Sequence, residues 1–208
     1  MYPVKAFAVD DAPALLTELL GSMAATLVTQ GPGGLCSTIL PVLYDPDVGE
    51  DGTISGHVAR GNPIVREAHG GEALVVVTGT DFYVTPSWYP SKAQHGKVVP
   101  TWDYVTVEAA GPLVLHDDPD WLLDLVTALT DRHEGERAEP WSVSDAPASY
   151  VAATLKGIVG IEVPLTRLAA KAKLSQTRPA ADVAGVVAGL RADGHHALAD
   201  AVDRANPT

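Results

Sequence analysis

The spacing of apolar residues predicts several amphipathic helices along the chain. Within residues 10–23, leucines recur three and four positions apart behind Asp10 and Asp11, either of which can cap a helix at its N-terminus. The same pattern follows Asp118 or Asp120 and continues to residue 129. Asn62-Pro63 is expected to open a short helix. Three further helices are expected over residues 146–155, 179–190 and 195–202.

Short apolar runs separated by glycine and proline predict the strands. They cover residues 24–29, 35–44, 53–59, 73–83, 98–115 and 158–168. Residues 98–115 are expected to form either a strand pair or one bent strand, with a kink near Gly111-Pro112. Short strands at such regular intervals favour a small closed barrel. We therefore expect a mainly β chain with helices. It would form one domain over residues 1–208, with a barrel core over about 1–116 and a helical and strand extension over about 117–208.

Composition and charge narrow the function classes. The 208 residues carry a formal net charge of −12, with 26 acidic and 14 basic side chains. DNA binding draws much of its affinity from basic groups that neutralise phosphates, and the sequence contains no helix-turn-helix, zinc-finger spacing or basic arm. Direct binding to nucleic acid is therefore not expected.

The chain also lacks the usual signs of export or membrane insertion. No apolar run approaches the roughly 18 residues that a membrane span needs, and the N-terminus does not resemble a signal peptide. Cys36 is the single cysteine, so no disulfide can form within the chain. We expect a cytoplasmic protein with no membrane partner.

Residues 82–104 hold six of the twelve aromatic side chains. Trp88 and Trp102 lie in this segment among short hydroxyls and cations, including Ser87 and Lys92. Flat rings beside hydroxyls and lysines suit a planar ligand that ends in an anion. The alternative is a well-packed aromatic hairpin, either internal or at a dimer interface.

Residues 56–63 and 163–178 supply further candidates for binding. His57 alternates with apolar neighbours along its strand, so its side chain faces away from the apolar side. It could be a cofactor ligand, a proton donor or a structural histidine. Arg60 precedes a helix N-terminus, an arrangement that suits an anion. Residues 163–178 carry four cations and no acid, which indicates either a cationic wall over an anionic ligand or a solvated strand.

Six motifs, taken together, resemble the PaiB-like family of FMN-binding negative transcriptional regulators. They are STILP (37–41), GHVARGNP (56–63), TPSWYPSK (85–92), VPTWDY (99–104), GIVGIEV (157–163) and KAKLSQTR (171–178). The resemblance covers essentially the whole chain. It implies a split-barrel flavoprotein fold related to pyridoxamine-phosphate oxidase, and a homodimer that holds FMN at its subunit interface.

The resemblance and the local patterns together give one set of candidate cofactor-binding residues. They are His57, Arg60, Asn62, Ser87, Trp88, Lys92, Trp102, Lys171, Lys173, Ser175 and Gln176. The chain departs from the usual family pattern at four positions, namely Ile39, Asp103, Glu108 and Thr177. Asp103 stands where the family usually has asparagine, and an ionised carboxylate can only accept hydrogen bonds. Unlike an amide, a carboxylate can take up and release a proton, so Asp103 is one candidate acid–base residue. His57 is the other, because an imidazole can also donate a proton.

Three functions are compatible with these residues. The first is a homodimeric, flavin-dependent oxidoreductase that acts on a small molecule, with FMN supplying the redox chemistry. The second is a haem-binding enzyme similar to piperazate synthases, with His57 as the axial ligand. The third is a non-catalytic regulatory module that acts through a protein partner.

Overall fold

The computed structural model describes residues 1–2, 4–68 and 70–207, which form two compact units. Unit 1 comprises residues 1–10, 78–106 and 170–208, and unit 2 comprises residues 11–77 and 107–169. The division falls within three long strands, β5 (Glu72–Val84), β6 (Thr101–Pro112) and β9 (Arg167–Lys173). Because β5, β6 and β9 each run from one unit into the other, the two units are interleaved along the sequence.

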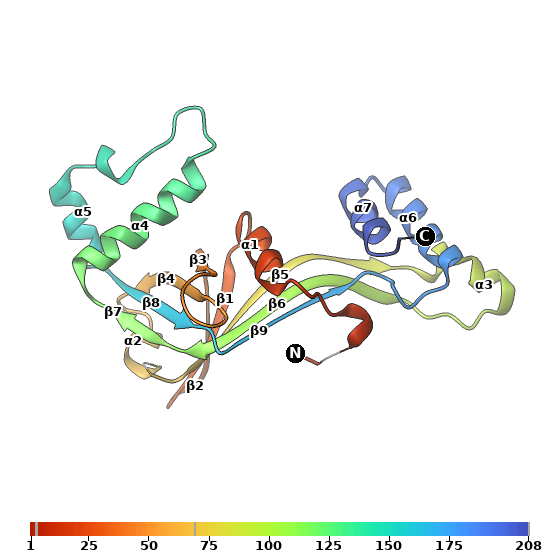
Figure 1. Cartoon of the computed structure of the whole chain (residues 1–208), viewed down its shortest axis with the longest axis horizontal. Coiled ribbons are helices and arrows are strands. Elements are labelled where there is room, and N and C mark those ends of the chain that lie inside the picture. Colours follow the sequence, from red (N-terminus) through yellow and green to blue (C-terminus); the bar gives the residue numbers. More distant parts are fainter. Residues whose placement is uncertain (3, 69, 208) are drawn as a thin grey trace. The chain divides into compact units, whose positions relative to one another are not determined.

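Antiparallel strands dominate both units (Figure 1). The strands are β1 (Ala25–Gly31), β2 (Gly34–Leu40), β3 (Val42–Asp45), β4 (Thr53–Ala59), β5 (Glu72–Val84), β6 (Thr101–Pro112), β7 (Val114–His116), β8 (Ile158–Pro164) and β9 (Arg167–Lys173). One sheet has the order β2-β1-β5-β6-β9 and the other β3-β4-β8-β7. The strands thus form two sheets and not the single closed barrel expected from their spacing.

Short helices connect and cover these strands. The α-helices are α1 (Ala12–Leu20), α2 (Ile64–Glu67), α3 (Pro90–His95), α4 (Pro119–Glu134), α5 (Ala148–Leu155), α6 (Ala180–Ala192) and α7 (His196–Arg204). The 3-10 turns are η1 (Lys5–Phe7), η2 (Pro86–Trp88) and η3 (Val143–Asp145). The expected caps are confirmed, because Asp11 accepts from the Ala14 amide at 2.9 Å and Asp118 accepts from the Trp121 amide at 2.9 Å. None of the described helices is long and apolar enough to cross a membrane.

Two of the expected strands are each divided in two, and the strand pair expected over residues 98–115 is confirmed, with its break at Pro112. The segment 35–44 breaks at Pro41 into β2 and β3, which belong to different sheets. Residues 158–168 divide after Pro164 into β8 and β9, and residues 98–115 divide after Pro112 into β6 and β7. Proline has no N–H to donate to a strand ladder, so each break falls where backbone pairing is interrupted. The sequence reading also missed α3, which begins at Pro90 inside the aromatic segment.

Each unit has its own apolar core. In unit 1, Phe82 and Val84 of β5 pack with Tyr89, Leu174 and apolar residues of α6 and α7. Figure 1 shows α6 and α7 over one side of these strands. In unit 2, β4 and β8 pair from Thr53–Pro164 to Ala59–Ile158, and the fully buried side chains include Ile54, Ile161 and Leu122.

Candidate functional site

A small polar cavity of about 160 Å³ lies in unit 1 beside a buried carboxylate. Its lining residues are Phe7, Thr101, Asp103, Lys173, Ser175, Thr177 and Arg178. The Asp103 side chain is 0% exposed. One of its oxygens accepts from Lys173 Nζ at 2.9 Å and the other from Ser175 Oγ at 2.6 Å. Lys173 Nζ also donates to Thr101 Oγ1 at 2.9 Å and to the Trp102 carbonyl. The cluster therefore joins β6 to the end of β9.

The turn that follows β9 shapes one wall of this cavity. Ser175 has a φ of 66°, which a residue with a side chain rarely adopts. Gln176 holds the turn, because its Oε1 accepts from the Leu174 amide at 2.7 Å and its Nε2 donates to the Ala172 carbonyl at 2.6 Å. Backbone strain of this kind persists only where the surroundings enforce it, and it gathers at functional sites. Gln176 therefore supports the cavity wall and does not line the cavity.

Two further cations of unit 1 lie against aromatic rings. The Arg178 guanidinium lies 4.6 Å from the centre of the Tyr89 ring. Burial raises the pKa of the Tyr89 hydroxyl, and the positive charge of Arg178 opposes this rise. Lys171 is buried, with Nζ 5.5 Å from the ring centre of Tyr104 and 5.9 Å from that of Phe7. Cation–π contacts keep these cations in place.

The aromatic segment has packed and exposed parts. The ring of Trp88 packs on α6, where a Cβ placed at Gly189 would come within 2.4 Å of it. Lys92 Nζ donates to Ser87 Oγ at 3.3 Å at the surface. Trp102 is 55% exposed and meets Tyr83 edge-on, with ring centres 6.1 Å apart. Trp102 therefore offers a free aromatic surface, whereas Trp88 contributes to packing.

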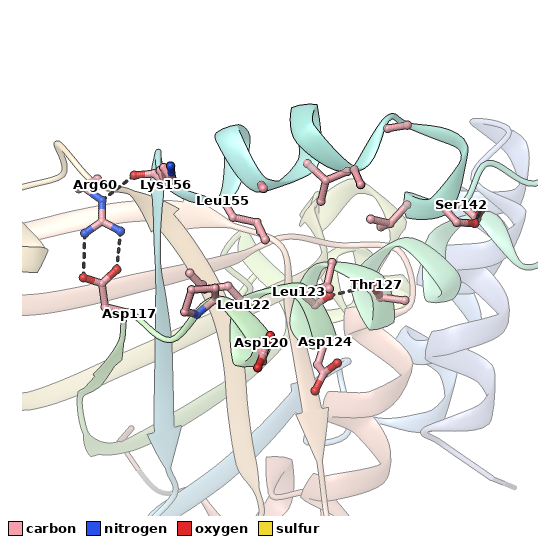
Figure 2. Close-up of a pocket in the computed structure, with 17 residues that line it drawn as sticks. Arg60, Asp117, Asp120, Leu122, Leu123, Asp124, Thr127, Ser142, Leu155 and Lys156 are labelled. Atoms are coloured by element: carbon pink, nitrogen blue, oxygen red, sulfur yellow. Dashed lines mark hydrogen bonds and ion pairs between the residues drawn. The ribbon is translucent and has the colours of Figure 1, made fainter.

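The remaining candidates, His57, Arg60 and Asn62, lie in unit 2. Arg60 makes a bidentate pair with Asp117, at 2.5 and 3.1 Å, and donates to the carbonyls of Lys156 and Ile158 (Figure 2). Hydrogen bonding between the two side chains raises the pKa of Arg60 and lowers that of Asp117. Asn62 donates to Thr38 Oγ1 at 3.0 Å and caps α2 through the Ile64 amide. Four of the five N–H groups of Arg60 are thus already in use.

His57 belongs to a cluster that the sequence reading did not identify. It lies on the less buried face of β4, as expected, and pairs across the sheet with Gly160 of β8. His116 of β7 pairs with the same glycine and stacks on Trp121, with ring centres 4.0 Å apart. A Cβ at position 160 would lie 2.1 Å from the Trp121 ring, so only glycine admits this packing. In the sequence, only Gly160, the second glycine of GIVG, pointed to this close packing.

Burial gives His57 a neutral imidazole. Burial lowers the pKa of His57 below its ordinary value of 6.5, and Nδ1 has no hydrogen-bond partner among the described residues. The described residues contain no group of three histidine, cysteine or acidic side chains that could hold a metal ion. The structure therefore brings together Asp103, Lys173 and Ser175 in unit 1, and places His57, Arg60 and Asn62 separately in unit 2.

Comparisons with known proteins identify relatives by sequence. A family model described as "Putative FMN-binding domain" matches residues 1–167. Protease synthase and sporulation protein PAI 2 of Bacillus subtilis is 30% identical over 192 residues, covering 92% of this chain and 89% of that protein. An uncharacterised protein of Aspergillus fumigatus is 31% identical over 213 residues, which cover 82% of each chain.

Solved structures with low sequence identity share the fold. A conserved hypothetical protein from Mycobacterium tuberculosis has a TM-score of 0.55 at 14% identity, covering 86% of this chain and 94% of that one. An FAD and haem binding protein from Mycobacterium smegmatis has a TM-score of 0.54 at 19% identity, covering 77% and 70%. The match over residues 1–167 and the 30% identity with the Bacillus subtilis protein confirm the family that the six motifs indicated. The chain belongs to the PaiB-like family of proteins with an FMN-binding domain, and its two-sheet fold is that of the split-barrel flavoproteins.

Proposed function

We propose that the chain binds FMN and holds the FMN phosphate in the polar cavity of unit 1. The main support for this placement is the charge of the cavity lining. Two cations, Lys173 and Arg178, line it beside three hydroxyl side chains and one carboxylate. In a chain with a net charge of −12, a local excess of positive charge is exceptional. In this proposal Arg178 supplies the charge-assisted hydrogen bonds to the phosphate. Lys173 contributes its charge, because its three N–H groups are already donated to Thr101, Trp102 and Asp103.

The size of the cavity limits what it holds. About 160 Å³ accommodates a phosphate group, whereas sites that enclose whole small molecules measure roughly 300–1,000 Å³. In this proposal only the phosphate enters the cavity. The exposed ring of Trp102, in the same unit, gives a flat surface for the isoalloxazine.

The second part of the proposal is that the protein is a flavin-dependent oxidoreductase for a small molecule. When bound, FMN supplies hydride transfer. Asp103 accepts from Lys173 and Ser175, so its role is to fix both side chains in the wall of the cavity. We further propose a homodimer, since β2 exposes Leu35 and Ile39, which are 76% and 75% exposed, along one face. Light scattering at micromolar concentration tests the dimer, and a monomer mass contradicts it.

A titration of cofactor-free protein with FMN tests the phosphate site. Arg178→Gln removes a charge-assisted contact worth about 1.5–3 kcal/mol, so FMN affinity should fall roughly ten- to a hundredfold. Arg60→Gln is the matched variant in unit 2, where the guanidinium is already bonded to Asp117. A loss confined to Arg60→Gln would move the phosphate to unit 2, as the GHVARGNP motif implied. Unchanged affinity in both variants would contradict both placements.

One observation favours a second candidate, haem binding. His57 has a depressed pKa and a buried nitrogen without a partner, and a neutral imidazole is the form that ligates iron. The absorption spectrum of the purified protein separates the two candidates, since flavin gives paired bands in the blue and near-ultraviolet and haem gives one intense Soret band. His57→Ala should abolish a Soret band, and a flavin spectrum that is insensitive to this change would exclude the haem candidate.

A further inference from the structure

A second cavity, of about 880 Å³, lies in unit 2 between α4 and α5. Figure 2 shows the two helices on either side of it. The α4 wall carries Leu123 and Thr127, and the α5 wall carries Val151, Ala152 and Leu155. In Figure 2 the Thr127 hydroxyl bonds back to the Leu123 carbonyl within α4, at 2.8 Å. All of its lining residues belong to unit 2, and none of them lines the polar cavity of unit 1.

Apart from Lys156 at one end, the charged side chains that line this cavity are either paired or directed away from it. At one end Arg60 and Asp117 neutralise each other through their bidentate pair. Asp120 and Asp124 of α4 point away from α5 in Figure 2. At the other end Ser142 and Ser144 share a hydrogen bond of 2.7 Å between their hydroxyls. A charged ligand would therefore find few groups to pair with along the walls, and losing its hydration would be costly.

We propose that the cavity between α4 and α5 is a binding site for an uncharged, largely apolar small molecule. The volume falls within the range of small-molecule sites, and the apolar walls with a few polar groups at the ends are the usual composition of such sites. Cavities lined by apolar side chains take up apolar ligands, because water gains few hydrogen bonds there.

A fluorescent probe of matching chemistry tests this site. The probe is 1-N-phenylnaphthylamine, which is uncharged and becomes brightly fluorescent in an apolar environment. Ala152→Phe places a phenyl ring inside the cavity and should weaken probe binding at least tenfold. Ala153→Phe is the matched control, because Ala153 is exposed on the same helix and does not line the cavity, so its affinity should match that of the unaltered protein. Circular dichroism confirms that each variant is folded, and Ala148→Phe is a second filling variant in case Ala152→Phe does not fold.

The outcomes also separate this site from the FMN site. Probe binding should be the same in cofactor-free and FMN-saturated protein, because the two cavities share no lining residue. Displacement of the probe by FMN would overturn the inference by making the cavity part of the cofactor site. Equal binding to Ala152→Phe and Ala153→Phe would place the probe elsewhere and also overturn it. A change of oligomeric state in Ala152→Phe would assign the cavity to a contact between copies of the chain and thus refute the small-molecule site.

Discussion

Replacing Lys173 by methionine should destabilise unit 1 through the carboxylate that it leaves behind. Asp103 is fully buried, and Lys173, whose side chain is 21% exposed, is its cationic partner at 2.9 Å. After the change, Asp103 retains only the Ser175 hydroxyl as a side-chain donor among the described residues. Removing one partner of a buried ion pair costs about 3–5 kcal/mol, and the partial exposure of Lys173 favours the lower end. We therefore expect a loss of about 3 kcal/mol in the free energy of unfolding.

Urea unfolding followed by tryptophan fluorescence measures this loss, since Trp88 and Trp102 both lie in unit 1. Lys92→Met is the matched control, because the hydrogen bond that Lys92 donates to Ser87 lies at the surface, and its effect should stay below about 0.5 kcal/mol. The double variant Asp103→Asn/Lys173→Met buries no charge and should regain at least about 1.5 kcal/mol relative to Lys173→Met. The reasoning is refuted if Lys173→Met costs no more than Lys92→Met, or if the double variant is as unstable as Lys173→Met.

Three further predictions concern packing, pH and nucleic acid. Gly160→Ala should lower the free energy of unfolding, measured with urea, by about 1–3 kcal/mol, because its Cβ would overlap the Trp121 ring. Gly61→Ala is the control, since a Cβ there meets open space and should leave this free energy nearly unchanged. Because burial lowers the pKa of His57, the unfolded chain is protonated first as the pH falls, so the free energy of unfolding should drop below about pH 6.5 and level off below the folded pKa. His57→Gln should reduce this slope, and an unchanged slope would contradict the assignment. With a charge of −12 the protein should give no mobility shift with duplex DNA at physiological salt, and sub-micromolar binding would contradict the charge argument.

The sequence predicted the features that depend on neighbouring residues. Asp11, Asp118 and Asn62 each cap a helix through a backbone amide two or three positions away, so the local sequence contains all the information. The alternation along β4 likewise placed His57 on the correct face.

Features that join distant segments were not predictable in this way. Asp103 and Lys173 were each candidates, but their pairing spans 70 positions and depends on how β6 and β9 meet. The Arg60–Asp117 pair spans 57 positions, and it turned an expected anion-binding guanidinium into one with few free donors. The packing of Trp121 over Gly160 likewise required the cross-strand register of β8.

The placement of α6 and α7 has a consequence for any fragment of this protein. The family model matches the chain as far as residue 167. Leu174, Val186 and Leu190 lie beyond that point, yet they supply much of the core of unit 1. A fragment cut at residue 167 would expose Phe82 and Val84 to water and would retain Asp103 without Lys173. Such a fragment should aggregate on expression, since exposed apolar strands associate readily. The shortest fragment that can fold on its own is therefore longer than the segment that the family model matches.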